Sequence, residues 1–456
     1  MPSPAPPGSL RKTFAERALS VVADVRAGEG SGVLLLSLNV FLLLTAYYFI
    51  RPVRNALILT QGGAEVRSYS AAGQAVLLLA VVPIYGALAS RMNRIRLISW
   101  VSVFFAANLV VFYAAGMAGA REGVVFYLWV GIFNVLIIAQ FWAFANDLYT
   151  ESSGKRLFPI LMLAANLGAI AGGKIEASAI GSIGPYGMML STAGLLMVCI
   201  AISHVIHKHA AADPVQFAPR PAEEPLAKTG AWELIARDRY LLLIAALMVL
   251  LNLVNSSGEY LLARLVEQTA RAATTDTAAQ QVIIGRFYGN FDSLFSTVGM
   301  LLQVFAVSRI FRYIGVRGAL FILPCIALVG YSFVLFLPLL AVIRWAKIAE
   351  NGTDYSIQNT TRQALFLPTS REAKYKAKTA IDTFFQRGGD VLSAAIVGAG
   401  AQMALNVKWF AAVNAVLTLV WLVAAFKIGR EYDRRTEVVA EAVAAGTGAV
   451  AGSSVA

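Results

Sequence analysis

Residues 32–57 read GVLLLSLNVFLLLTAYYFIRPVRNAL, a long apolar run that ends in a segment with two arginines. A hydrocarbon core about 30 Å thick requires about 20 predominantly apolar residues in a helix, and this run is long enough to cross it. Similar runs recur along the chain, of whose 456 residues 58% are hydrophobic and 14% charged, with a mean hydropathy of +0.66. That composition excludes a water-soluble enzyme, a disordered chain and a disulfide scaffold. The sequence predicts an all-α polytopic membrane protein.

Charged or Gly/Pro-rich breaks separate the apolar runs into two sets of six. The first set is Gly32–Leu57, Ser70–Ala89, Leu97–Met117, Val124–Ala145, Leu157–Ile180 and Tyr186–Ile206. The second set is Tyr240–Leu265, Arg286–Val307, Ala319–Phe336, Leu339–Gln358, Lys378–Gln402 and Trp409–Phe426. Leu337-Pro338 must make the whole turn between the ninth and tenth spans. We expect an N-terminal segment (1–31), a six-helix bundle (32–206), a proline-rich linker (207–238), a second six-helix bundle (239–427) and a tail (428–456).

The distribution of lysine and arginine predicts the orientation of these twelve spans. If both termini lie inside, 26 basic residues fall on the cytoplasmic side and five on the other side, namely Arg67, Arg121, Arg264, Arg271 and Lys408. Cytoplasmic loops carry such an excess. We expect a monomeric, lipid-embedded protein of the bacterial inner membrane, with both termini and the linker in the cytoplasm. The net charge of +12 then reports topology, and a nucleic-acid partner is not expected.

Two short patterns recur in corresponding places of the two halves. Ser-Arg-x-x-Arg begins at residues 90 and 308, which are 218 apart, and a Gly-Gly pair begins at residues 172 and 388, which are 216 apart. The two offsets agree closely and indicate duplicated six-helix halves. The first pattern, with Gly86, Arg91 and Arg94, resembles the signature loop of the major facilitator superfamily between its second and third helices. That resemblance implies a central cavity and alternating access by rocking of two bundles.

Ionisable residues inside the apolar spans are the candidate functional positions, because a charge in the membrane is costly unless it is paired or faces a cavity. The basic ones are Arg51, Arg54, Lys174, Arg286, Arg344, Lys347 and Arg387. The acidic ones are Glu176, Glu259, Asp292, Glu350, Asp354, Asp382 and Asp390. The two signs balance, so for any one residue a structural ion pair and a substrate contact both stay open.

The tenth predicted span carries the densest set of polar residues. Residues 344, 347, 350, 351, 354 and 358 fall within about a third of the helix circumference. This stripe must line a cavity or meet a second charged helix. The eleventh span offers one, since Asp382, Gln386 and Asp390 share one face. In the first span, Arg51 and Arg54 suit phosphate or carboxylate because a guanidinium donates two parallel hydrogen bonds, although both could also lie at the outer headgroup level.

Several segments resemble the nucleotide transporter family, the ATP/ADP translocases of plastids and intracellular bacteria. These segments are Tyr48-Phe-Ile-Arg51-Pro-Val-Arg54-Asn, Phe141-Trp-Ala-Phe-Ala-Asn146-Asp147, Lys155-Arg156-Leu-Phe-Pro159, Ala165-Asn166-Leu-Gly168 and Lys374-Tyr-Lys376-Ala-Lys378-Thr-Ala-Ile-Asp382. The resemblance implies exchange of a nucleoside triphosphate for a diphosphate without hydrolysis. It places Arg54 at the family's phosphate-binding lysine of the first helix and Tyr127 at its acidic residue of the fourth. The family's glutamate of the seventh helix corresponds to Asn255, or to Glu259 after a shift of one turn.

The sequence therefore predicts a secondary transporter for a small anionic solute, with a nucleotide suspected. The candidate substrate-binding residues are Arg51, Arg54, Tyr127, Asn255, Glu259, Arg344, Lys347 and Asp354. The candidate coupling or gating residues are Glu350, Asp382, Arg387, Asp390, Arg91 and Arg94. Two alternatives stay open: a proton-coupled symporter or exporter of another solute, and a membrane protein that transports nothing. Because no phosphate-binding loop, nucleophile motif or metal-ligand spacing occurs, neither an enzyme nor a cofactor or metal is expected.

Overall fold

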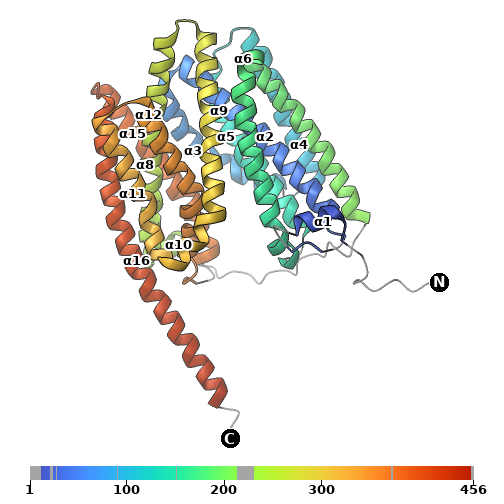
Figure 1. Cartoon of the computed structure of the whole chain (residues 1–456), viewed down its shortest axis with the longest axis vertical. Helices are drawn as coiled ribbons and strands as arrows, with labels where there is room; N and C mark the ends of the chain where they lie inside the picture. The colour runs from blue at the N-terminus through green and yellow to red at the C-terminus, as the bar shows by residue number, and fades with distance from the viewer. Residues whose placement is uncertain are drawn as a thin grey trace, which may run out of the picture. The chain divides into compact units, whose positions relative to one another are not determined.

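The computed structural model describes residues 12–20, 24–26, 28–89, 91–149, 151–212, 231–370 and 373–452. Within these ranges all regular secondary structure is helical, which confirms the predicted all-α class. Ser90, residues 1–11 and the part of the predicted linker from 213 to 230 lie outside the described residues. The longer α-helices, shown in Figure 1, are α2 (Gly30–Gln61), α3 (Gly63–Ala89), α4 (Arg94–Met117), α5 (Gly123–Leu148), α6 (Glu151–Ala212), α8 (Arg239–Ala273), α9 (Thr277–Leu301), α11 (Gly315–Phe336), α12 (Leu340–Thr353), α15 (Gln386–Gln402) and α16 (Val407–Gly452).

The shorter helical pieces lie at ends and interruptions of the long ones. They are α1 (Phe14–Leu19), α7 (Ala231–Arg237), α10 (Val307–Tyr313), α13 (Asn359–Leu365) and α14 (Lys378–Ala380). Four π-helical turns accompany them: η1 (Leu302–Ala306), η2 (Asp354–Gln358), η3 (Ala373–Ala377) and η4 (Ile381–Phe385). Among the described residues, nine helical segments are long and apolar enough to cross a membrane. The chain is therefore a multi-pass membrane protein, and the count of twelve spans stays a prediction.

The chain packs as two compact units that do not follow the order of the sequence. The first unit contains the described residues of Met1–Gly62, Leu77–Glu223 and Ala270–Ser296, and the second contains those of Gly63–Val76, Glu224–Thr269 and Thr297–Ala456. The division passes through α3 and α9. The N-terminal part of α3 thus belongs to the second unit and the rest to the first, whereas most of α9 belongs to the first unit and its last residues to the second.

In the first unit, α2 packs against α5 and α6, and α4 packs against the same two helices (Figure 1). Helix α6 is interrupted at Gly184, whose φ of 70° and ψ of 172° are not helical, immediately before Pro185. The hydroxyl of Thr45 donates to the carbonyl oxygen of Gly168 at 3.2 Å, and the hydroxyl of Thr192 donates to that of Ala46 at 3.5 Å. Both arms of α6 therefore lie beside the same turn of α2, so the chain reverses at Gly184. These arms correspond to the fifth and sixth predicted spans.

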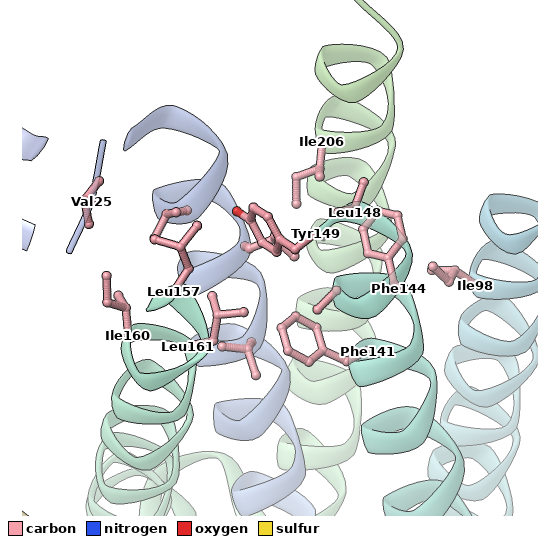
Figure 2. Packing of buried hydrophobic residues seen from close by; sticks show 14 residues of the cluster. Val25, Ile98, Phe141, Phe144, Leu148, Tyr149, Leu157, Ile160, Leu161 and Ile206 are labelled. Atoms are coloured by element: carbon pink, nitrogen blue, oxygen red, sulfur yellow. The ribbon is translucent and has the colours of Figure 1, made fainter. Parts of the chain in front are cut away.

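An apolar cluster lies among α2, α4, α5 and both arms of α6 (Figure 2). Phe141, Phe144, Leu148 and Leu161 are almost fully buried there. Because lipid is as apolar as these side chains, close van der Waals packing rather than transfer from water stabilises such contacts in a membrane. The cluster fixes the mutual position of the helices that carry the polar residues described below.

In the second unit, α11 packs against α12 and α16. Helix α11 ends at Phe336 and α12 begins at Leu340, so the turn at Leu337-Pro338 lies where the sequence predicts it. The tenth and eleventh predicted spans are interrupted by η2 and η4. A π turn widens the helix by one residue and rotates the side chains that follow it, and such turns are frequent at functional sites.

Candidate substrate site

The stretch at the end of α2 places Arg54 against an aromatic ring of α5. The guanidinium carbon of Arg54 lies 4.4 Å from the ring centroid of Tyr127, a distance typical of a cation–π contact. Tyr127 is 5% exposed, and the Nε of Arg54 is buried without a hydrogen-bond partner. Arg54 forms no ion pair with any carboxylate of the described residues. Within the described part of the chain, the guanidinium therefore meets the face of an aromatic ring rather than a carboxylate.

Arg51, one turn earlier, is placed differently. Its Nε lies 3.5 Å from Oδ2 of Asp292, a residue of α9 that is 1% exposed. Its guanidinium carbon also lies 5.3 Å from the ring centroid of Phe295 and 5.4 Å from that of Tyr48. Arg51 thus forms an ion pair with a buried carboxylate in the second half of α9.

In the second unit, Lys347 of α12 is completely buried and lies at the centre of a polar network. Its Nζ donates to Oδ1 of Asn255 at 2.6 Å and to Oε1 of Glu350 at 3.0 Å, and it lies 3.7 Å from Oε1 of Glu259. The hydroxyl of Tyr331 donates to the other oxygen of Glu350 at 2.9 Å. Four predicted residues, two from the tenth span and two from the seventh, therefore meet here.

Glu259 connects this network to a residue that the sequence interpretation missed. Nη2 of Arg67 lies 3.2 Å from Oε2 of Glu259, and Nδ2 of Asn351 donates to Oε1 at 3.2 Å. The sequence places Arg67 on the outer side, in the loop before the second predicted span. In the structure α3 begins earlier, at Gly63, so Arg67 lies in that helix, within the part that belongs to the second unit. With Arg67 included, two cations and two carboxylates compensate each other.

The sequence analysis offers the eleventh span as the charged helix that the polar stripe of α12 meets. In the structure, Lys347 of this stripe contacts α8 instead. On α15, Oδ1 of Asp390 accepts hydrogen bonds from Ser256 at 2.5 Å and from Asn252 at 2.8 Å, both of α8. Helix α8 is thus the common partner of α12 and α15. Sequence periodicity identified the polar faces but not which neighbour each face contacts.

The remaining candidate residues form local pairs. Oδ2 of Asp390 lies 3.5 Å from Nη1 of Arg387, and Asp382 lies 3.5 Å from Nζ of Lys378. Further pairs join Arg362 to Asp354 at 3.9 Å and Arg94 to Asp147 at 2.6 Å, and the guanidinium carbon of Arg344 lies 6.0 Å from the ring centroid of Trp345. Arg91 is exposed.

Three of the four glycines in the repeated Gly-Gly pairs allow close helix contact. A methyl group on Gly172 would lie 2.9 Å from Cα of Thr45 in α2, and one on Gly389 would lie 2.8 Å from the backbone nitrogen of Leu253 in α8. A methyl group on Gly173 would lie 2.7 Å from the carbonyl oxygen of Gly289, whereas one on Gly388 would meet nothing within 4 Å. The fifth span against the first, and the eleventh against the seventh, therefore use the same packing device.

A buried carboxyl at the start of α5 was also missed. Glu122 precedes the first turn of α5 and is 5% exposed, and neither of its carboxylate oxygens has a hydrogen-bond partner among the described residues. Burial raises its pKa from the ordinary 4.5 to about 7. A single acidic residue in a loop gives no sequence signal of burial, so only the packing reveals this group.

The TLC ATP/ADP transporter family matches residues 122–348 and 334–432 of this chain. The chain belongs to the TLC ATP/ADP transporter family. It is 24% identical to ADP,ATP carrier protein 1 of Chlamydia pneumoniae over 359 residues, which are 68% of this chain and 67% of that protein. It is 25% identical to ADP,ATP carrier protein 5 of Rickettsia conorii over 361 residues, or 67% and 68% of the two chains.

The similarity extends to a plant protein but does not span it. The plastidic ATP/ADP-transporter of Solanum tuberosum is 22% identical over 66% of this chain and 52% of its own length. The chain spans about two thirds of the bacterial TLC relatives that it matches, with 62% for ADP,ATP carrier protein 1 of Chlamydia trachomatis. These relatives confirm the predicted family, and with it a transporter rather than an enzyme. They do not favour a carrier of an unrelated solute or a protein that transports nothing.

Solved structures show the fold. The nucleoside transporter NupG covers 87% of this TLC chain and 98% of its own, with a TM-score of 0.58 and 12% identity. A bacterial homologue of the iron transporter ferroportin in an inward-facing state covers 88% and 98%, with a TM-score of 0.62 and 13% identity. At this identity the likeness shows the fold alone, and it confirms the major facilitator architecture.

Proposed function

We propose that this TLC family member exchanges ATP for ADP across the membrane by alternating access, without hydrolysing either nucleotide. The observation that carries the proposal is the arginine of α2 stacked on Tyr127. Arg54 forms no ion pair with a described carboxylate. A guanidinium in that state retains its attraction for phosphate and can donate parallel hydrogen bonds to it.

The contrast between Arg54 and Lys347 supports this division of roles. Lys347 shares its charge with Glu350 and Glu259, and its hydrogen-bond donors already have protein acceptors. A phosphate group that entered this network would lose its water and would be repelled by the two carboxylates, which have the same sign of charge. Arg54 therefore provides the main phosphate contact, and the network around Lys347 holds α8, α12 and α3 together and offers Asn255 and Glu259 to polar groups of the solute.

The experiment that tests the proposal is uptake of labelled ATP into proteoliposomes that contain the purified protein, with and without ADP inside. Exchange requires internal nucleotide, so uptake is expected to be rapid with internal ADP and close to background without it. Unlabelled ATP outside should compete, and inorganic phosphate alone should compete weakly. Uptake that is unaffected by internal nucleotide would contradict exchange, and absence of any nucleotide uptake by well-folded protein would contradict the substrate class.

We further propose the placement of this carrier in the cell. We propose that it is a monomer of the bacterial inner membrane. The 26 basic residues on one side, against five on the other, support a cytoplasmic location of both termini and of the linker. The same assignment keeps residues 32–206 and 239–427 as six-helix halves. Labelling of single cysteines introduced at Ser9 and Ser453 with an impermeant reagent tests it, since neither site should react in intact cells and both should react after lysis.

A further inference from the structure

Glu176, in the first arm of α6, has a role in neither the proposed phosphate contact nor the network around Lys347. Its side chain is completely buried, and neither carboxylate oxygen has a hydrogen-bond partner among the described residues. An ionised carboxylate without hydrogen bonds or a paired cation is too costly to keep in an apolar interior. The group is therefore present as the neutral, protonated acid.

The carboxyl lies in a tight seam between α6 and α9. A methyl group on Gly289 of α9 would fall 2.0 Å from Oε2 of Glu176, and one on Gly285 would fall 3.1 Å from Oε1. The same methyl group on Gly289 would fall 2.7 Å from the carbonyl oxygen of Gly173. The two backbones thus touch through glycines, as in small-residue helix interfaces, and leave no room for water beside the carboxyl.

The charged groups around the seam compensate a charge on Glu176 only in part, through the exposed guanidinium of Arg286. From α9, Asp292 is a second carboxyl, and it pairs with Arg51 of α2. On the α6 arm itself, Nζ of Lys174 donates to Oδ1 of Asn290 at 3.3 Å. The guanidinium of Arg286 in α9 is exposed and lies beside Gly181, further along the seam. Two cations are thus occupied by α9 acceptors, and the nearest carboxylate repels an additional negative charge.

We propose that Glu176 is a proton-binding site that locks the middle of α9 onto α6. While the seam is closed, the carboxyl keeps its proton. When the seam opens, water reaches the carboxyl, the O–H bond breaks, and the proton passes to water and leaves a carboxylate. Reclosure requires that a proton be taken up again. Opening of this seam is therefore linked to the pH of the compartment that it faces.

This inference rests on the proposed function only for the motion that opens the seam. The seam joins α6, from the first half of the sequence, to α9, from the second, and the proposed alternating access is what would open it. The chemistry of the lock itself needs no nucleotide. For one proton released on opening, the ratio of open to closed protein rises about tenfold per pH unit, as long as the closed form is neutral and the open form charged.

Labelling of a cysteine placed in the seam tests the lock. Ser293 of α9 is 8% exposed, and its Cβ would lie 3.3 Å from a methyl group on Gly173. The full chain with Ser293→Cys, in which Cys199 and Cys325 are replaced by alanine, is reconstituted and treated with N-ethylmaleimide over a range of pH. The same protein with Glu176→Gln is the matched control, because its amide cannot ionise and the ionisation of the thiol is common to both.

The expected result is that the labelling rate, divided by that of the Glu176→Gln control, rises by about tenfold per pH unit above neutrality. A ratio that stays constant with pH would overturn the proposal. A second reference is the Gly289→Ala variant, in which the added methyl group prevents the seam from closing. Its labelling should be rapid, with the pH dependence of the thiol alone. If the Glu176→Gln protein did not fold, the carboxyl could not be the neutral acid inferred here, and this too would overturn the proposal.

These outcomes are separate from those of the exchange experiment. A protein that exchanges nucleotides but shows a constant labelling ratio retains the proposed function and loses the proton lock. A protein with a pH-dependent seam but no nucleotide uptake retains the lock and loses the nucleotide assignment.

Discussion

The guanidinium carbon of Arg54 lies 4.4 Å from the ring centroid of Tyr127, and no described carboxylate pairs with it. Three residues earlier on the same helix, Arg51 is engaged by Asp292. Two arginines that look equivalent in the sequence are therefore distinct: Arg51 pairs with an acid of another helix, and Arg54 is the phosphate contact that we propose.

Replacement of Arg54 by alanine should strongly impair nucleotide exchange at low ATP concentration and leave the fold intact. A charge-assisted hydrogen bond contributes about 1.5–3 kcal/mol, which corresponds to a loss of about 10- to 150-fold in apparent affinity for ATP. Arg54→Lys keeps the charge without the planar fork and should retain part of the activity. Arg121→Ala removes an exposed arginine near the start of α5 and serves as the control. Normal exchange by a folded Arg54→Ala protein would remove Arg54 from the substrate site.

The aromatic face beneath Arg54 should matter more than the hydroxyl group of the tyrosine. A cation–π contact contributes about 0.5–2 kcal/mol, so Tyr127→Leu should raise the apparent Michaelis constant for ATP by about 2- to 30-fold. Tyr127→Phe retains the ring and should stay close to wild type. Kinetics of ATP uptake measure both variants. Equal impairment of the two would show that the hydroxyl, not the ring, is required.

Removal of the cation in the second unit should destabilise the protein. Lys347→Met leaves Glu350 and Glu259 without their common partner, and breaking a buried pair in this way costs about 3–5 kcal/mol. The measurement is thermal unfolding in detergent, with exposed Lys374→Met as the control. The double variant Lys347→Met/Glu350→Gln should recover part of the loss, because it also removes a buried charge. Unchanged unfolding of the single variant would contradict the network described for Lys347.

Glu122 should make stability depend on pH. Burial raises its pKa from 4.5 to about 7, so the unfolded chain loses this proton at lower pH than the folded chain. Below about pH 4.5 the carboxyl is protonated in both the folded and the unfolded chain, and Glu122 makes its full contribution to the free energy of unfolding. As the pH rises toward 7, this contribution falls by up to about 1.4 kcal/mol per pH unit.

The comparison that isolates this carboxyl is Glu122→Gln. The melting temperature of the variant should fall less than that of wild type between about pH 5 and 7, since the amide does not titrate. Glu233→Gln, at an exposed position of α7, should leave the pH profile as it is. Identical profiles for wild type and Glu122→Gln would exclude a neutral carboxyl at this position.

Local sequence features predicted the bounds of helices and turns well, because these depend on the residues of one segment and not on its neighbours. The run Gly32–Leu57 became α2, Gly30–Gln61, and the Leu337-Pro338 turn separates α11 from α12 as expected. Both follow from apolar length and from the conformational restriction of proline, which need no knowledge of neighbours.

Properties that depend on neighbouring helices could not be predicted in the same way. Periodicity showed that Lys347 and Glu350 share a face, yet not that the face meets Asn255 and Glu259 of α8, because helix rotation and helix order are set by packing. The same reason explains why Arg67 was missed. The π turn at Asp354–Gln358 has no simple sequence signature, and it shifts the stripe after Thr353 away from the ideal helical positions.

The ion pair between Arg51 and Asp292 has a consequence for the insertion of the protein into the membrane. Arg51 emerges from the ribosome 241 residues before Asp292, its partner, and synthesis at about 5–20 residues per second makes this interval about 12–50 s. During that interval an arginine of the first helix enters the bilayer with no acidic counterpart from α9. Until α9 is made, Arg51 must therefore be sheltered by the insertion machinery or held by lipid phosphate.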